Sequence, residues 1–304
     1  MAFAGQEYAA TMRGVGNAEE FEKLANNISP ETTPLYSLIG QVDIASDKFE
    51  WIVDSLATPA ANAIIEAASI TAASTAIPTR LYNYAQQLEK TFAISDRQQA
   101  IQKKQGGSFD VKQQLQNRTL EVRRDFEYAI CVNTARTLGT TGAAQVTGGL
   151  GYWLLTSNNS VANVVAGGSA RPTETVLLTA MQQQWDDHEP GNMAVLCSST
   201  NKLVIDGFSG GAIKNTNVGD KKLTNTVKIY ESSFGIFKMI TSRYVPNTDI
   251  YVLDLDYVKS AILIPIEHVQ LGFTKHAEEH MVHMVGGLKV SAINAHAHIA
   301  SLAA

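Results

Sequence analysis

Cysteine, charged residues and long apolar runs are all scarce in this sequence. Cys131 and Cys197 are the only cysteines among 304 residues, which is too few for a disulfide framework and indicates a reducing compartment. Charged residues make up 17% of the chain, below the usual value of about a quarter, so we expect part of the surface to be covered rather than solvated. No apolar run reaches the length of a membrane span, and the N-terminus lacks the basic start and apolar core of a signal peptide.

An excess of positive charge is also missing. The net charge is −5, which argues against a protein that reads nucleic-acid sequence, because such proteins usually carry a basic face. Hydrophobic residues make up 45% of the chain, enough to bury a sizeable core. The length allows one large domain or two medium ones.

Motifs for catalysis and metal binding are weak. Gly207, Ser209 and Gly211 fit the G-x-S-x-G pattern in letters, but the residues before them predict a helix, whereas a nucleophile elbow needs a strand there. We therefore favour a glycine-rich helix end, and keep a hydrolase using Ser209 as an alternative. The sequence has no Walker A motif, and no G-x-G-x-x-G follows a predicted strand. We expect no catalytic residue and no cofactor.

The histidines give no stronger signal for a metal site. His276, His280 and His283 would share one face of a helix, but the surrounding residues predict a strand and a turn, in which His280 and His283 point in opposite directions. His296 and His298 share a strand face, but two ligands do not make a closed site. We interpret all of them as structural and expect no bound metal.

The first third of the chain predicts extended segments with little core of their own. Residues 1–27 indicate an extended arm, and Ser29 and Pro30 suit the start of a helical turn that stops at Gly40. Residues 49–56, 80–86 and 91–95 alternate as strands do, whereas residues 57–79 carry almost no charge. We interpret residues 50–95 as a long two-stranded excursion that needs a neighbour to lie on, because an isolated hairpin is marginal in water.

A long helix is predicted over residues 108–138. Ser108 suits its N-cap and Gly139 its end, and at about 1.5 Å per residue it would span roughly 45 Å. We expect ion pairs Arg123–Glu127 and Glu121–Arg124 on its surface. The face expected to be buried has apolar or small residues at three- and four-residue steps: Val111, Leu115, Val122, Phe126, Ala129 and Asn133.

The remainder of the chain mixes helices with antiparallel strands. Helices are predicted at 173–188, with Trp185 on the buried face, and at 201–208. Strands are predicted at 193–197, 226–230, 235–241, 250–254 and 261–264. A final hairpin is expected between residues 280–285 and 288–297, with its turn at Gly286 and Gly287. The fold class is therefore α+β.

An ordered set of segments gives the chain a resemblance to a known family. The segments are "ISPETTPLYSLIG" at 28–40, "FEWIVDSLA" at 49–57, "LEVRRDFEYAI" at 120–130, "GGLGYWLLTSN" at 148–158, "QQWDDHEPGN" at 183–192, "VKIYESSFGIFKMITSRYVP" at 227–246 and "AILIP" at 261–265. This order resembles the major capsid proteins of tailed bacteriophages with the Hong Kong 97-type fold, in a branch that shares an "ISPxxTP" opening. The similarity covers nearly the whole chain.

The resemblance implies a role for each part. Residues 1–48 would be an N-terminal arm and residues 49–105 an extended β-hairpin loop that lies over a neighbouring subunit. Residues 106–191 and 263–304 would form a peripheral domain with a spine helix at 108–138, and residues 192–262 an axial domain. We expect deletion of residues 57–92 to leave a soluble subunit that forms no stable shell. The residues expected to contact neighbouring subunits are Pro30, Pro34, Trp51, Tyr82, Tyr84, Gln86 and Phe92.

The implied function is structural. Such a chain would assemble into hexamers and pentamers that form an icosahedral head around packaged double-stranded DNA, in the virion, after assembly in the host bacterial cytoplasm. Implied partners are other copies of the chain, a portal protein and a possible separate scaffolding or decoration protein, with non-specific proximity to DNA and no membrane. We expect no scaffolding segment ahead of the arm, so that scaffolding would be a separate protein or the chain would be the mature form. Nothing marks Lys90 or Lys103 for the crosslink known in the family's type member. The main alternative is an encapsulin-like nanocompartment shell, and a neighbouring portal or terminase gene would favour the phage.

Overall fold

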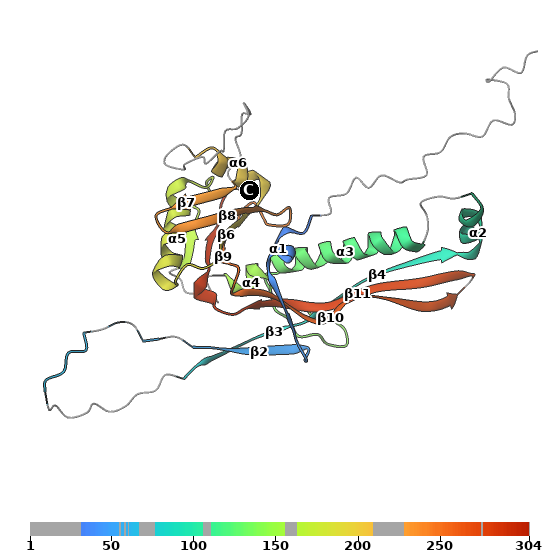
Figure 1. Ribbon diagram of the computed structural model, residues 1–304, viewed down its shortest axis with the longest axis horizontal. Helices are drawn as coiled ribbons and strands as arrows, with labels where there is room; N and C mark the ends of the chain where they lie inside the picture. The colour runs from blue at the N-terminus through green and yellow to red at the C-terminus, as the bar shows by residue number, and fades with distance from the viewer. Residues whose placement is uncertain are drawn as a thin grey trace, which may run out of the picture.

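Two β-sheets, a two-stranded ribbon and one long helix make up most of the structure (Figure 1). The computed structural model describes residues 32–54, 56–57, 59, 61–66, 77–105, 111–155, 163–208, 228–274 and 276–303. The predicted arm at residues 1–27, Ser29, Pro30 and Ser108 lie outside these ranges. None of the described helices is long and apolar enough to cross a membrane.

A four-stranded sheet forms an elongated part of the molecule, which we call the sheet arm, as distinct from the N-terminal arm predicted at residues 1–48. Its strands lie in the order β1 (Gly40–Asp43), β10 (Val258–Thr274), β11 (Ala277–Val290) and β4 (Gln86–Ser95). β1 runs parallel to β10, and the other pairs are antiparallel. β10 is far longer than the strand predicted at 261–264, and it carries register shifts where β4 carries none.

The predicted turn at Gly286 and Gly287 is wrong, because β11 runs straight through both residues. The chain reverses instead beside His276, whose φ is 59°. Gly287 is required for close packing: a Cβ there would lie 2.7 Å from Oγ1 of Thr147 and 2.8 Å from the carbonyl oxygen of Tyr84.

Helix α3 (Val111–Val132) lies along one face of this sheet (Figure 1). Val122, Phe126 and Ala129 are buried as the spacing predicted. The helix ends six residues before the predicted end at 138, because the chain turns at Asn133. The carbonyl of Asn133 accepts hydrogen bonds from the backbone of Gly149 and Tyr152, and its side-chain amide donates to Gln86 and Thr147. A further helix, α2 (Asp96–Gln105), follows β4 where the sequence predicted an extended loop.

Both ion pairs predicted on the long helix are wrong. Glu127 is buried rather than paired with Arg123 on the surface. Glu121 pairs with Arg118 at 2.5 Å rather than with Arg124. The i,i+3 and i,i+4 spacings left several partners open, and the packing around the helix selected among them.

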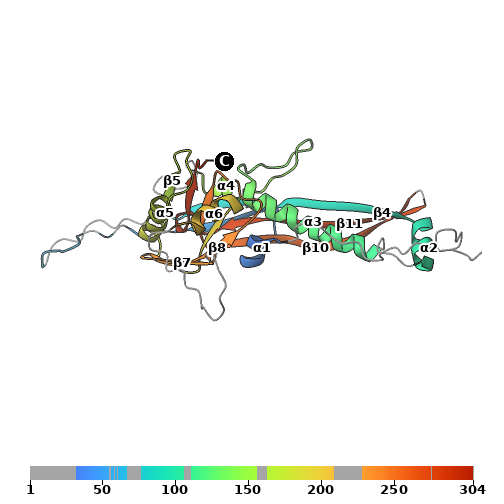
Figure 2. The same ribbon diagram turned by 90° about the horizontal axis from the view of Figure 1, so that it is seen from above.

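A six-stranded sheet forms the second unit, beside one end of the sheet arm (Figures 1 and 2). Its order is β5 (Val164–Ala166), β12 (Ala297–Ala300), β9 (Ile250–Asp254), β6 (Met193–Cys197), β8 (Gly235–Thr241) and β7 (Ile229–Ser232). β6 and β9 are buried along their whole length, as their continuous apolar sequences predict.

Helix α5 (Glu174–Asp187) packs on one face of the six-stranded sheet, with Leu177, Ala180 and Met181 in the core. Thr173 caps it, because its hydroxyl accepts from the backbone N–H of Val176. Trp185, predicted on the buried face, is 51% exposed. Gln184 is buried in its place, since its amide donates to the carbonyl oxygen of Ala295. Helices α4 (Leu150–Trp153), α6 (Ser199–Asp206) and α1 (Pro34–Leu38) and the 3-10 turn at Ile293–Ala295 complete the described structure.

The ribbon pairs β2 (Lys48–Val53) with β3 (Thr79–Tyr84). The predicted two-stranded excursion over 50–95 is therefore too long, because β4 belongs to the four-stranded sheet. β5 and β12, from the predicted peripheral ranges, lie in the same sheet as β6 and β9, from the predicted axial range. The domain division itself stays a prediction.

Candidate functional site: assembly surfaces and their anchors

The candidate catalytic and metal-binding residues do not come together. Ser209 lies outside the described residues. On β11, His280 is buried with its Nδ1 2.9 Å from Nε2 of His268, while Nε2 of His283 lies 3.1 Å from a carboxylate oxygen of Glu267. Within the part of the chain that the structure describes, no three His, Cys, Asp or Glu residues are placed to hold a metal ion.

The remaining histidines and the cysteines are structural. Burial lowers the pKa of His296 to about 3, so the ring is neutral and its Nδ1 accepts from the backbone N–H of Asp254. The ring nitrogens of His298 lie 3.0 Å from the carbonyl oxygen of Leu154 and 2.7 Å from Oδ1 of Asp249. Both cysteines are free and buried, and burial raises the pKa of the Cys197 thiol to about 12, which leaves no reactive thiolate.

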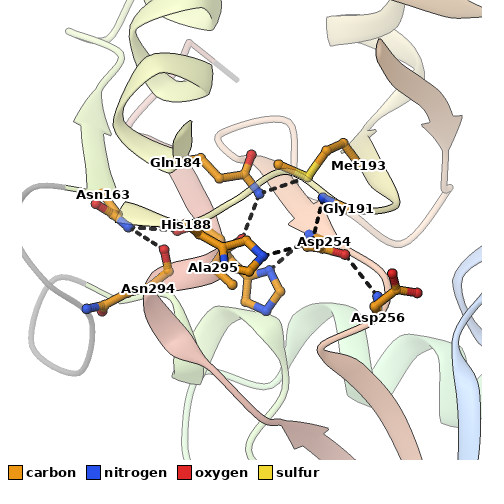
Figure 3. A network of polar contacts seen from close by, with 10 residues as sticks. Asn163, Gln184, His188, Gly191, Met193, Asp254, Asp256, Asn294 and Ala295 are labelled. Carbon is orange, nitrogen blue, oxygen red and sulfur yellow. Dashed lines mark hydrogen bonds and ion pairs between the residues drawn. The ribbon is translucent and has the colours of Figure 1, made fainter. Parts of the chain in front are cut away.

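A polar network fixes the junction between the two sheets (Figure 3). Asp254 ends β9, and four residues later β10 begins. Its buried carboxylate lies 3.1 Å from Nε2 of His188 and accepts from the backbone N–H groups of Gly191 and Asp256. A carboxylate that gathers these partners holds the end of α5 and the turn after β9 together, so the two sheets meet in one defined arrangement.

Asn83 connects the ribbon to the sheet arm. Its fully buried side-chain amide donates to Oγ1 of Thr147 and to the carbonyl oxygens of Gly148 and Leu288, at 3.1, 3.0 and 2.6 Å. Its Oδ1 accepts from the backbone N–H groups of Gly148 and Tyr84, both at 2.9 Å. Asn83 was not among the residues predicted from the sequence, although a polar residue on the inward-facing side of an alternating strand is the signal that points to it.

The predicted contact residues of the ribbon are partly covered within the chain. Tyr82 and Tyr84 meet edge to face, with ring centroids 5.7 Å apart. The guanidinium carbon of Arg136 lies 3.6 Å from the centroid of the Tyr82 ring, and Arg136 also donates to the Tyr82 carbonyl oxygen. Trp51 is only 8% exposed and packs against Trp153, which leaves it little surface for a neighbouring subunit.

The other predicted contact residues are scattered. Gln86 accepts from the amide of Asn133, Phe92 stacks on His280 with ring centroids 4.9 Å apart, and Pro34 begins α1. Pro30 lies outside the described residues. Which of these residues contact a neighbouring subunit stays a prediction.

Within the part of the chain that the structure describes, large apolar side chains are exposed at two places, among others, that the predicted contact residues did not include. One is the loop between β2 and β3, where a low charge density was the signal available in the sequence. Its exposed residues, together with Ile52 on β2, are Leu56, Ile64, Ile65 and Ile77. The other is the outer end of β10, with Val269, Leu271 and Phe273.

Glu127 anchors the end of the N-terminal region. Its carboxylate oxygens accept from the backbone N–H groups of Leu35 and Tyr36, at 3.0 and 2.7 Å, and from the hydroxyl of Ser242 at 3.3 Å. Burial raises its pKa, and the three hydrogen bonds act against that rise. Thr33, the N-cap residue, makes no side-chain cap, so a carboxylate from α3 satisfies the first amides of α1.

Solved shell structures match this architecture over almost its whole length. No curated protein sequence matches the chain. The capsid of cyanophage A-1(L) matches with a TM-score of 0.68 and 10% identity over 97% of this chain and 99% of that one. The capsid of a native GTA particle matches with a TM-score of 0.66 and 14% identity, over 97% and 98%. The SrpI encapsulin of Synechococcus elongatus PCC 7942 matches less well, with a TM-score of 0.58 and 13% identity over 96% and 94%.

The fold, two sheets with a long helix and a projecting ribbon, is therefore that of the phage capsid shell proteins. The family model for the SU10 major capsid protein matches residues 8–303, so this chain belongs to the SU10 major capsid protein family. The predicted α+β capsid fold and the predicted resemblance to phage major capsid proteins are confirmed. The chain is a capsid shell protein of the virion, and its family is structural.

Proposed function

We propose that this chain forms the hexamers and pentamers of an icosahedral head around packaged double-stranded DNA. The observation that carries the proposal is the apolar loop between β2 and β3. Leu56 is 97% exposed, Ile65 85% and Ile77 91%, and apolar exposure of this extent within one loop favours a surface that another protein covers. A second copy of the chain supplies that cover in a shell.

The roles of the parts belong to the same proposal. Residues 1–48 act as an arm, the segment after residue 49 as the extended loop, and α3 as the spine of a peripheral domain. Sheet membership favours an axial domain that is larger than residues 192–262 and that includes β5, α5 and β12. The boundary then lies near Asp254, where the polar network joins the two sheets.

Partners beyond the chain itself are also proposals. A portal protein and a separate scaffolding or decoration protein would complete the head. One structural neighbour, from phage G, is a major capsid protein described together with decoration proteins. Co-purification of particles from infected cells, followed by mass spectrometry, tests for each partner.

The loop is tested by replacing residues 54–78 with an Asn-Gly turn. The pairing of Val53 with Thr79 suits a two-residue turn, so the ribbon can close. The deletion of 57–92 that the sequence suggested would also remove β3 and most of β4, and would damage the sheets. We expect the turn variant to stay folded by circular dichroism and to form no stable shell in negative-stain electron microscopy.

A second variant keeps the length of the loop. Ile64→Ser with Ile65→Ser removes apolar surface only, and we expect fewer or less stable shells. Tyr128→Ser is the matched control, because it removes an exposed apolar ring from α3 and leaves the loop intact. Wild-type shells from the turn variant would contradict the proposed role of the loop.

The alternative is an encapsulin-like nanocompartment, which the weaker match to the SrpI encapsulin supports. The contents of purified particles separate the two. Nuclease-protected double-stranded DNA supports the phage head, and a stoichiometric enzyme cargo supports the nanocompartment. The hydrolase alternative is tested by Ser209→Ala, which would abolish any esterase activity that the purified chain shows.

A further inference from the structure

The sheet arm, with α2 and α3 on one side, differs in charge between its two faces. The helix face carries positive charge, and the opposite face of the sheet carries carboxylates. Residues 96–125, about a tenth of the chain, hold seven of its 24 lysines and arginines but only four of its 29 acidic residues. These residues include α2 and the first two thirds of α3. A chain that is acidic overall therefore has a local excess of positive charge on its helices.

Five of the seven positive charges in this segment are exposed and have no ion pair among the described residues. Glu121 forms an ion pair with Arg118 at 2.5 Å, and Asp125 forms one with Lys90 of β4 at 2.9 Å. Asp96, at the start of α2, is the remaining described acid of this segment, and Glu278 of β11 accepts from the side-chain amide of Gln99 on α2. The exposed cations without an ion pair among the described residues are Arg97, Lys103, Lys104, Lys112 and Arg123.

The face of the sheet arm that is turned away from α3 carries negative charge instead. Val282 and Met284 of β11 are buried in the core that includes Val122 and Phe126 of α3, so His283 between them points to the other face. In register with His283 lie Glu89 on β4 and Glu267 on β10, and both glutamates are exposed. The face turned away from the helices thus carries two exposed carboxylates, one on each side of His283.

We propose that α2 and α3 form a face that binds the phosphate backbone of double-stranded DNA without reading its sequence. The inference rests on the proposed function, because it assigns the inner side of the head to the helices and the outer side to the sheet. The 22 residues of α3 span about 33 Å at about 1.5 Å per residue, close to one turn of the duplex at roughly 34 Å. Lysine, arginine and glutamine side chains, which dominate residues 97–118, are the usual donors to phosphate.

The strength of this binding follows from the number of phosphates neutralised. Five cations give a slope of about −4.5 for log K against log salt concentration, which is a loss of roughly 500-fold in affinity between 50 and 200 mM salt. The acidic remainder of the chain opposes the contact. The binding is therefore weak at physiological salt, and a shell lined by such faces holds packaged DNA without trapping it.

The test uses the full-length chain and a fluorescent 30-base-pair duplex of arbitrary sequence. Fluorescence anisotropy gives the affinity at several salt concentrations. The test variant carries Lys103→Gln, Lys104→Gln and Lys112→Gln, and we expect its slope to fall to about −1.8, since two cations remain. The control carries Arg171→Gln, Lys228→Gln and Lys238→Gln, which make the same charge change on the six-stranded unit, and we expect its slope to stay at the wild-type value.

Three other outcomes overturn the proposal. No binding by the wild-type chain at 50 mM salt refutes it directly. An equal loss in both triple variants means that net charge, rather than this face, attracts the duplex. Unchanged duplex affinity with lost shell formation in the test variant means that the helices contact the acidic sheet face of a second copy. Shell formation is scored separately by negative stain, so a wild-type chain that binds the duplex but forms no shell contradicts the proposed head and leaves the DNA-binding face standing.

Discussion

Replacing Asn83 tests whether one buried side chain holds the ribbon on the body. The perturbations are Asn83→Ala, which removes all of its side-chain hydrogen bonds, and Asn83→Asp, which replaces the donor amide with a second acceptor oxygen. Asn83 has no exposed surface, and a Cβ on Gly287 would already lie 2.7 Å from Oγ1 of Thr147. Removing the carboxamide leaves space for about one water molecule, which makes at most about four hydrogen bonds, fewer than the five of the Asn83 side chain.

The magnitude follows from the partners that are left behind. Asn83→Ala leaves the N–H of Gly148 and the carbonyl oxygens of Gly148 and Leu288 without their side-chain partner. A buried group left unsatisfied costs about 1–3 kcal/mol, and shared geometry makes the costs less than additive. We expect a loss of about 3–5 kcal/mol in the free energy of unfolding. Asn83→Asp is expected to cost more at neutral pH, because an ionised carboxylate would face the carbonyl oxygens of Gly148 and Leu288, which cannot donate.

Urea denaturation of unassembled subunits, followed by tryptophan fluorescence, measures this loss. Trp51 and Trp153 pack together where the ribbon meets α4, so their fluorescence reports on the ribbon. Asn247→Ala is the control, because that residue is exposed, and we expect it to change stability by less than about 0.5 kcal/mol. A loss below about 1 kcal/mol for Asn83→Ala would refute the reasoning that this network anchors the ribbon.

Three further predictions concern α3 and the second sheet. Val122→Asp or Phe126→Asp should prevent folding, because each buries an unpaired charge; a soluble variant with native circular dichroism would contradict this. Glu127→Gln should lower the free energy of unfolding by about 1–2 kcal/mol, because the glutamine NH₂ group takes the place of one of the two accepting carboxylate oxygens. Hydrogen exchange at the amides of α1 should become faster, and unchanged protection would exclude Glu127 as their anchor. The Asp249–His298 pair should stabilise the fold above the ordinary carboxyl pKa. Burial raises the pKa of Asp249, but its hydrogen bonds from His298 and Thr248 outweigh this and lower it, so stability falls as pH drops through the lowered value. His298→Gln should flatten the acid-side fall in melting temperature, and identical slopes would disprove the link.

Periodicity was sufficient for some of the regular elements. The three- and four-residue steps of Val122, Phe126 and Ala129 predicted the buried face of α3, and the continuous apolar run at 193–197 predicted a central strand. Both patterns depend on local geometry and on which side faces the core, and tertiary contacts agreed with them. The ordered segments also carried enough information for the resemblance to phage capsid proteins.

Features that depend on distant partners were not accessible in the same way. The Gly286 and Gly287 pair is locally a good hairpin signal, but Thr147 and the Tyr84 carbonyl occupy the space that side chains would need, so the pair serves packing inside a strand. The spacing of Glu127 and Arg123 suits an ion pair. The carboxylate of Glu127 instead accepts a hydrogen bond from Tyr36 of α1, which lies 91 residues earlier in the chain.

By itself, the amino-acid sequence determined the class of the fold, the long helix, the charge-poor loop and the family. The tertiary structure alone decided where α3 ends, which sheet each strand joins, and which polar side chains are buried. The reason is physical: helix and strand periods are properties of neighbouring residues, whereas the partners of Asn83, Glu127 and Asp254 lie on other elements. Only the folded chain brings those partners within hydrogen-bonding distance.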